Sequence, residues 1–160
     1  MISRMLKLLH QLGAIGMMGS LAACAVLVAV APRESLVEYA AFRQGIEAVT
    51  RILLVPSLAL VLVSGLLAIA FNRAWHDAGW AWIKALLGIV MFEGTLLTIQ
   101  ASARRAAELS ALAASTATPD PAALEPLLRT ERGGLWLMLA LCFANVVLGV
   151  WRPRIGPRRR

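Results

Sequence analysis

The stretch from Trp80 to Gln100 reads WAWIKALLGIVMFEGTLLTIQ. A helix of roughly 20 apolar residues can cross about 30 Å of hydrocarbon, and this stretch meets that length. It nevertheless contains two charged residues, Lys84 and Glu93. Charged side chains inside a membrane helix are costly and usually serve a function. The stretch therefore predicts a transmembrane helix and raises the question of what its two charges do.

The rest of the chain has the same apolar character. Of its 160 residues, 59% are hydrophobic and 16% are charged, whereas soluble domains are typically about 45–50% apolar and about 25% charged. The apolar residues occur in four long runs, and tryptophans lie near the run ends, as interfacial aromatics do. The sequence thus predicts an all-α integral membrane protein, a four-helix bundle that occupies the whole chain as one domain. The expected spans are residues 6–31, 52–71, 80–100 and 135–151.

Two of these helices are expected to extend beyond the bilayer on the same side. Residues 33–50 and 101–115 have helical patterns that continue into the second and third spans. At about 1.5 Å per residue, each resulting helix would exceed about 50 Å, which is longer than the hydrocarbon layer. On one extension, Glu47 and Arg51 are spaced for an i,i+4 ion pair. The sequence STATPDP at 115–121 predicts a break, after which a short amphipathic segment leads into the fourth span.

The first span imitates a cleavable signal in two places. Leu21–Cys24 is similar to a bacterial lipobox, and Ala29–Ala31 is similar to an A-x-A cleavage site. However, the sequence after Cys24 stays apolar, and Pro32 would be the first mature residue, so we expect the helix to be retained. Cys24 and Cys142 are isolated in apolar runs and are expected to pack there, because a metal site would need clustered ligands.

The basic residues indicate a membrane surface rather than nucleic acid. The net charge is +7, and five of the sixteen Lys and Arg residues lie in the tail at 152–160, directly after the last apolar run. Such a tail suits anionic lipid headgroups. An even number of spans places both termini on one side, which carries eight basic residues against seven on the other. The dense tail favours cytoplasmic termini, and we expect the protein in a bacterial inner membrane.

Lys84 and Glu93 cannot belong to one site. They are nine residues apart, so they lie about half a turn apart around the helix and about 13 Å apart along it.

Lys84 lies about one turn inside the third span, and His10 lies equally deep in the first span, on the same side. Both helices carry small residues that allow close approach. The two faces are His10, Gly13, Met17 and Ser20 in the first span, and Lys84, Gly88, Met91 and Thr95 in the third.

These faces predict a polar pocket between the first and third spans, with His10 and Lys84 at one depth. The alternatives are that Lys84 extends to the headgroup interface and that His10 is a satisfied helix contact.

Glu93 is expected nearer the opposite side of the bilayer. Arg51, at the start of the second span, is its best partner by depth, and an Arg51–Glu93 ion pair would fix the helix packing. The alternative is that Glu93 relays protons or ions. Asn145 is expected to join helices by hydrogen bonding. Pro56 is expected to free a backbone carbonyl and kink the second span.

Four short motifs carry a resemblance to known families. They are KLLHQLGAIGMMG in the first span, RILLVPSLALVLVSG in the second, WAWIK at the start of the third, and an aromatic-Arg-Pro sequence after the fourth. Together they resemble the uncharacterised membrane family called domain of unknown function 2269, over nearly the whole chain. More distantly, the chain resembles the HemJ family of protoporphyrinogen oxidases and the CopD copper-resistance family. The HemJ resemblance matches His10, Arg51, Pro56 and Lys84, and it implies haem b bound through His10. It also implies that Lys84 and Arg51 take part in catalysis and offer positive charges to the carboxylates of the haem or of a substrate.

The chain departs from the HemJ pattern after the first span, where the expected further histidines are missing. A bis-His haem needs two imidazoles, and the second histidine of this chain, His76, lies in the turn before the third span.

Three functions stay open from the sequence. The first is a redox or tetrapyrrole-binding membrane protein, which would be an oxidoreductase of HemJ type if it catalyses a reaction. The second is a proton- or ion-coupled permease that uses Glu93. The third is an accessory protein whose projecting helices bind a membrane protein partner or a second copy.

Overall fold

The computed structural model describes residues 2–32, 34–72 and 78–151, and all regular structure in these ranges is helical. Four continuous rods are long and apolar enough to cross a membrane, so the predicted four-span, all-α architecture is confirmed. The tail at 152–160 and His76 lie outside the described residues. The rods are α1 (Ile2–Val30); α2 (Leu36–Val49), η1 (Thr50–Leu54) and α3 (Val55–Phe71); α5 (Gly79–Gly94), η2 (Thr95–Gln100) and α6 (Ala101–Thr116); and α7 (Pro121–Trp151).

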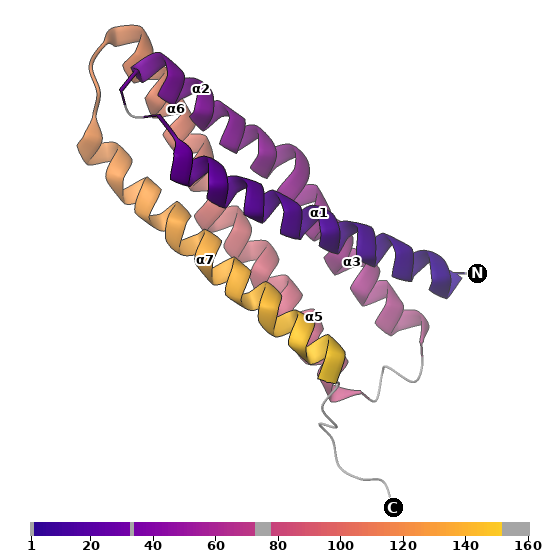
Figure 1. Ribbon diagram of the computed structural model, residues 1–160. Helices are drawn as coiled ribbons and strands as arrows, with labels where there is room; N and C mark the ends of the chain where they lie inside the picture. Colours follow the sequence, from indigo (N-terminus) through magenta and orange to yellow (C-terminus); the bar gives the residue numbers. More distant parts are fainter. Residues whose placement is uncertain (1, 33, 73–77, 152–160) are drawn as a thin grey trace, which may run out of the picture.

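The four rods form a bundle in which α1 and α5 lie diagonally opposite each other. Both α1 and α5 pack against α3 and α7. At one end α2 and α6 pack against each other and continue past the end of α1 (Figure 1), as the sequence predicts. We call this the projecting end, and we call the opposite end, where α1 begins and α7 ends, the terminal end. Toward the terminal end, the pair α1–α3 and the pair α5–α7 splay apart (Figure 1).

The segment boundaries follow local sequence signals. Ser35 caps α2 by accepting a hydrogen bond from the backbone N–H of Glu38. The predicted break at 115–121 is present, because α6 ends at Thr116, Ala117 adopts a left-handed conformation with φ 54°, and α7 begins at Pro121. The extensions are helical and continuous with their spans.

Both extended rods contain one π-helical turn, η1 in the second rod and η2 in the third, and the two turns contact each other. Turns of this kind widen a helix locally and often occur at functional sites. Pro56 lies two residues after the end of η1, in the first turn of α3. Since proline has no N–H to donate, the hydrogen-bond ladder is interrupted there in any case. The irregularity expected near Pro56 is therefore a π-helical turn that ends just before it.

Two glycines of α1, Gly13 and Gly16, face α3 and not the third span. A Cβ at Gly13 would lie 2.9 Å from the carbonyl oxygen of Ser57, and one at Gly16 would meet the hydroxyl of the same serine. The two backbones can approach only because both side chains are missing. The expectation that this stripe packs against the third span is therefore wrong. Sequence spacing identified the stripe correctly but could not choose between its neighbours.

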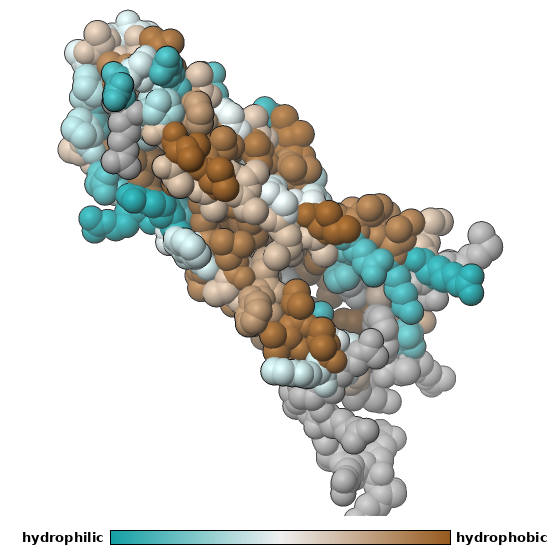
Figure 2. Space-filling model, viewed as in Figure 1, coloured by the Kyte–Doolittle hydropathy of each residue, from teal (hydrophilic) through white to brown (hydrophobic). Residues whose placement is uncertain are grey.

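Apolar side chains both fill the bundle and cover its middle. The core contains Leu21, Ile46, Leu58 and Ile99 together with the sulfur side chains of both cysteines, which are buried. On the face shown in Figure 2, hydrophobic residues cover the middle of the bundle, and hydrophilic ones gather at the projecting end and near the start of α1. This distribution is typical of a protein surrounded by lipid.

Candidate functional site

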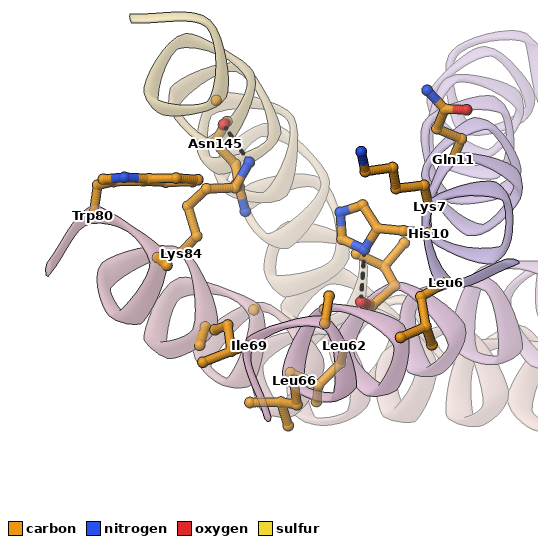
Figure 3. A pocket seen from close by; sticks show the side chains of 17 residues that line it. Leu6, Lys7, His10, Gln11, Leu62, Leu66, Ile69, Trp80, Lys84 and Asn145 are labelled. Atoms are coloured by element: carbon orange, nitrogen blue, oxygen red, sulfur yellow. Dashed lines mark hydrogen bonds between the residues drawn. The ribbon is translucent and has the colours of Figure 1, made fainter. Parts of the chain in front are cut away.

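A cavity of about 280 Å³ lies at the terminal end, between the two splayed pairs of helices. Residues of α1, α3, α5 and α7 line it (Figure 3). Most of its wall is apolar, and its polar groups are few, as in many ligand-binding cavities. The apolar wall includes Leu6, Leu62, Leu66, Ile69 and Ala81. His10 and Lys84 both line this cavity.

His10 is held over α3 by one of its two ring nitrogens. Its Nδ1 lies 3.0 Å from the carbonyl oxygen of Val61 and 3.2 Å from the hydroxyl oxygen of Ser64. The Ser64 hydroxyl itself donates to the carbonyl of Leu60, so both neighbours of Nδ1 act as acceptors. We therefore assign the proton to Nδ1. Nε2 then keeps a lone pair, and it is turned toward the open part of the cavity (Figure 3).

Gly65 on α3 leaves room for the imidazole of His10. A Cβ at this position would lie 3.5 Å from Cε1 of the ring, which is an ordinary contact, so a methyl group would fit but a larger side chain would push the ring. Together, Val61, Ser64 and Gly65 fix the tautomer and the position of the imidazole. A hydrogen bond from one ring nitrogen to a backbone carbonyl is the arrangement that orients metal-ligating histidines.

Lys84 reaches from α5 across to α7. Its ammonium donates a hydrogen bond to the backbone carbonyl of Asn145 at 3.3 Å. A Cβ at Gly149 would lie 3.0 Å from Nζ, so the missing side chain there makes room for the ammonium. Lys84 is partly buried, and its head lies within the cavity rather than on the outer surface. Asn145 contributes its main chain to this contact, which differs from the expected role of its side-chain amide.

The cavity has a basic character. Lys7, His10 and Lys84 line it, and none of the residues described around it is Asp or Glu. Gln11 and Trp80 add a further amide and an indole at its edge. An apolar chamber with ammonium groups on one side suits an amphiphilic ligand that carries an anionic group. Among the described residues, no group of three or more His, Cys, Asp and Glu side chains could hold a metal ion on its own.

Two residues expected near functional charges lie elsewhere. Arg51 is in η1, far along the second rod from the cavity, and pairs with Glu47 at 2.9 Å, which confirms that i,i+4 pair. The predicted Arg51–Glu93 ion pair is absent from the described residues, so this expectation is wrong. Glu93 is exposed on the outer face of α5. The two residues lie at similar depths along the bundle. Their side chains, however, point in different directions around their helices, so they do not meet.

A buried ion pair joins two residues that sequence reasoning missed. Arg43 on α2 donates from Nη2 to Oε2 of Glu131 on α7 at 2.7 Å, and the two side chains are 1% and 0% exposed. Arg43 Nε and Glu131 Oε1 have no hydrogen-bond partner within the described structure. Helical spacing could have signalled this pair. Arg43 lies between Ala40 and Ile46 on the buried face of α2, and Glu131 shares its face with Gly134, Leu135 and Met138.

A family model described as "Predicted integral membrane protein (DUF2269)" matches residues 4–153. The chain belongs to this family. The match covers all four rods, so the expected family is confirmed and the protein is an integral membrane protein with several spans. No curated protein and no solved structure matches the chain. The more distant likeness to the HemJ and CopD families stays a prediction.

Proposed function

We propose that the protein binds a tetrapyrrole, in the first instance haem b, in the cavity at the terminal end. The observation that carries this proposal is the state of His10. Its Nδ1 donates to the carbonyl of Val61, which leaves the Nε2 lone pair free to coordinate iron. A histidine that served only as a helix contact would have no need of a cavity in front of its second nitrogen.

The other cavity residues suit the remaining parts of such a ligand. Leu62, Leu66 and Ile69 offer an apolar surface to a flat ring. Lys84 and Lys7 offer ammonium groups to its carboxylates, which would otherwise be costly in a membrane. Haem bound there would supply one-electron redox chemistry at its iron. His10 would hold the iron, and Lys7 and Lys84 would neutralise the carboxylates.

The proposed site differs in one respect from what the family resemblance implies. Arg51 does not line this cavity, so a role in binding carboxylates falls to the two lysines instead. A permease that uses Glu93 receives no support from the geometry, because that side chain faces away from the bundle interior. We place the protein in a bacterial inner membrane with cytoplasmic termini, on the strength of its basic tail.

Visible absorption spectroscopy tests the proposal. The protein would be expressed with haem precursor, purified in mild detergent, and measured oxidised and after dithionite. We expect a Soret band with reduced b-type bands that disappear in His10→Ala. Leu12→Ala is the matched control, because Leu12 lies on the same helix, is 53% exposed and does not line the cavity. A colourless wild-type protein, or an unchanged spectrum in His10→Ala, would overturn the proposal.

A further inference from the structure

Glu93 lies on a face of α5 that no other described helix covers. The neighbouring residues on this face are Leu86, Val90 and Leu97, which are 63%, 48% and 73% exposed. With Glu93 they follow a spacing of four, three and four residues. This is the repeat of a helix–helix seam, in which alternate steps of three and four keep the same side facing a partner.

The membrane-spanning part of the third rod is the least buried of the four spans. The most apolar window of Gly79–Thr116 is 17% buried, compared with 28% for the first rod and 22% for each of the other two. A larger part of this span is therefore left to face lipid or another protein.

A carboxylate on this face requires a partner. Between the ends of the bundle, the exposed faces of α1, α3 and α7 carry large apolar side chains such as Ile15, Val63 and Phe143. Glu93 faces outward in the same way, and no ion pair or hydrogen bond to its side chain exists among the described residues. An ionised carboxylate exposed to hydrocarbon is unfavourable, whereas polar side chains that meet across two membrane helices stabilise their association.

From these observations we infer that a second copy of this chain covers the face, with α5 packed in parallel against α5 and Glu93 against its counterpart. Two copies inserted in one membrane have the same orientation, so a two-fold axis along the membrane normal brings equal depths together. A carboxyl group is self-complementary, since two of them can share a proton and form a hydrogen bond. A single polar residue within an apolar seam also fixes the register of the two helices. This interface is independent of the cavity and of any ligand in it.

Cysteine cross-linking in native membranes tests the interface. Leu97→Cys and Leu86→Cys retain Glu93 and place a thiol on the seam above and below it. We expect a disulfide-linked dimer on mild oxidation. Val63→Cys on α3 and Phe143→Cys on α7, at positions 53% and 71% exposed, are matched controls and should give only background. The two native cysteines are buried, so the wild type provides the blank.

Changing Glu93 in the Leu97→Cys protein completes the test. Glu93→Leu should abolish the dimer band, and Glu93→Gln should retain it, because amides also pair across helices. Cross-linking at the seam no stronger than at the controls would overturn the inference. So would an unchanged dimer in Glu93→Leu, or a product whose mass is not twice that of the chain, which would indicate a foreign partner.

Discussion

The two ends of the bundle use charge in opposite ways. At the projecting end, Arg43 and Glu131 lie in direct contact at 2.7 Å and are 1% and 0% exposed. At the terminal end, His10, Lys7 and Lys84 surround an open cavity of about 280 Å³ with no described acidic residue in its wall. One end pairs a buried basic group with a buried acidic group, whereas the other gathers basic residues around a cavity.

This difference distinguishes an ion pair that stabilises the fold from a binding site. A buried ion pair is costly to form but far more costly to break, because removal of one partner leaves an unpaired charge in a low-dielectric interior. Basic groups that line a cavity lie where an anionic ligand can reach them. We therefore expect substitutions at the projecting end to change stability and substitutions at the terminal end to change binding.

The largest effect is expected for Arg43→Ala. It leaves Glu131 buried without its partner and should lower the free energy of unfolding by about 3–5 kcal/mol. Thermal unfolding in mild detergent, followed by circular dichroism, measures this change. The double variant Arg43→Met with Glu131→Leu replaces the pair by apolar side chains and should recover most of the loss.

An exposed pair provides the control for this prediction. Arg104 and Glu108 on α6 are 3.0 Å apart but solvent-accessible, so Arg104→Ala should leave the melting temperature unchanged. Equal effects of Arg43→Ala and Arg104→Ala would remove the contrast between the buried pair and the surface.

An intermediate effect is expected at the seam between α1 and α3. Gly13→Ala would place a Cβ 2.9 Å from the Ser57 carbonyl oxygen, and such overpacking typically costs about 1–3 kcal/mol. Gly19→Ala on the same helix is the matched control, because a Cβ there meets nothing within 4 Å. If the two variants melt at the same temperature, close approach at Gly13 does not set the position of α1 or of the His10 side chain.

The smallest effect on stability is expected for Lys84→Met. The variant loses the 3.3 Å hydrogen bond to the Asn145 carbonyl, but it also removes a partly buried charge, so the free energy of unfolding should change by less than about 1 kcal/mol. Under the proposed function, the ratio of haem absorbance to protein absorbance should nevertheless fall. A destabilisation as large as that of Arg43→Ala would mean that Lys84 also stabilises the fold.

Much of the site could be predicted because depth is a local property. His10 and Lys84 were matched by counting turns from the span ends, and both line one cavity. Arg51 and Glu93 were matched by the same count, yet they do not meet, because one turns toward Glu47 and the other faces outward. Counting turns predicts the depth of a residue in the bilayer but not the direction in which its side chain points.

The sequence by itself determined the four spans, the two projecting helices and the break at 115–121, because hydropathy, helix rise and proline act within a segment. Only the tertiary structure decided that Gly13 meets α3, that Arg43 pairs with Glu131, and that Glu93 lies on an uncovered face. These features depend on how each helix is rotated about its axis and on which helices become its neighbours. Rotation and neighbours are set by packing between segments far apart in the chain, and periodicity within one segment carries no information about them.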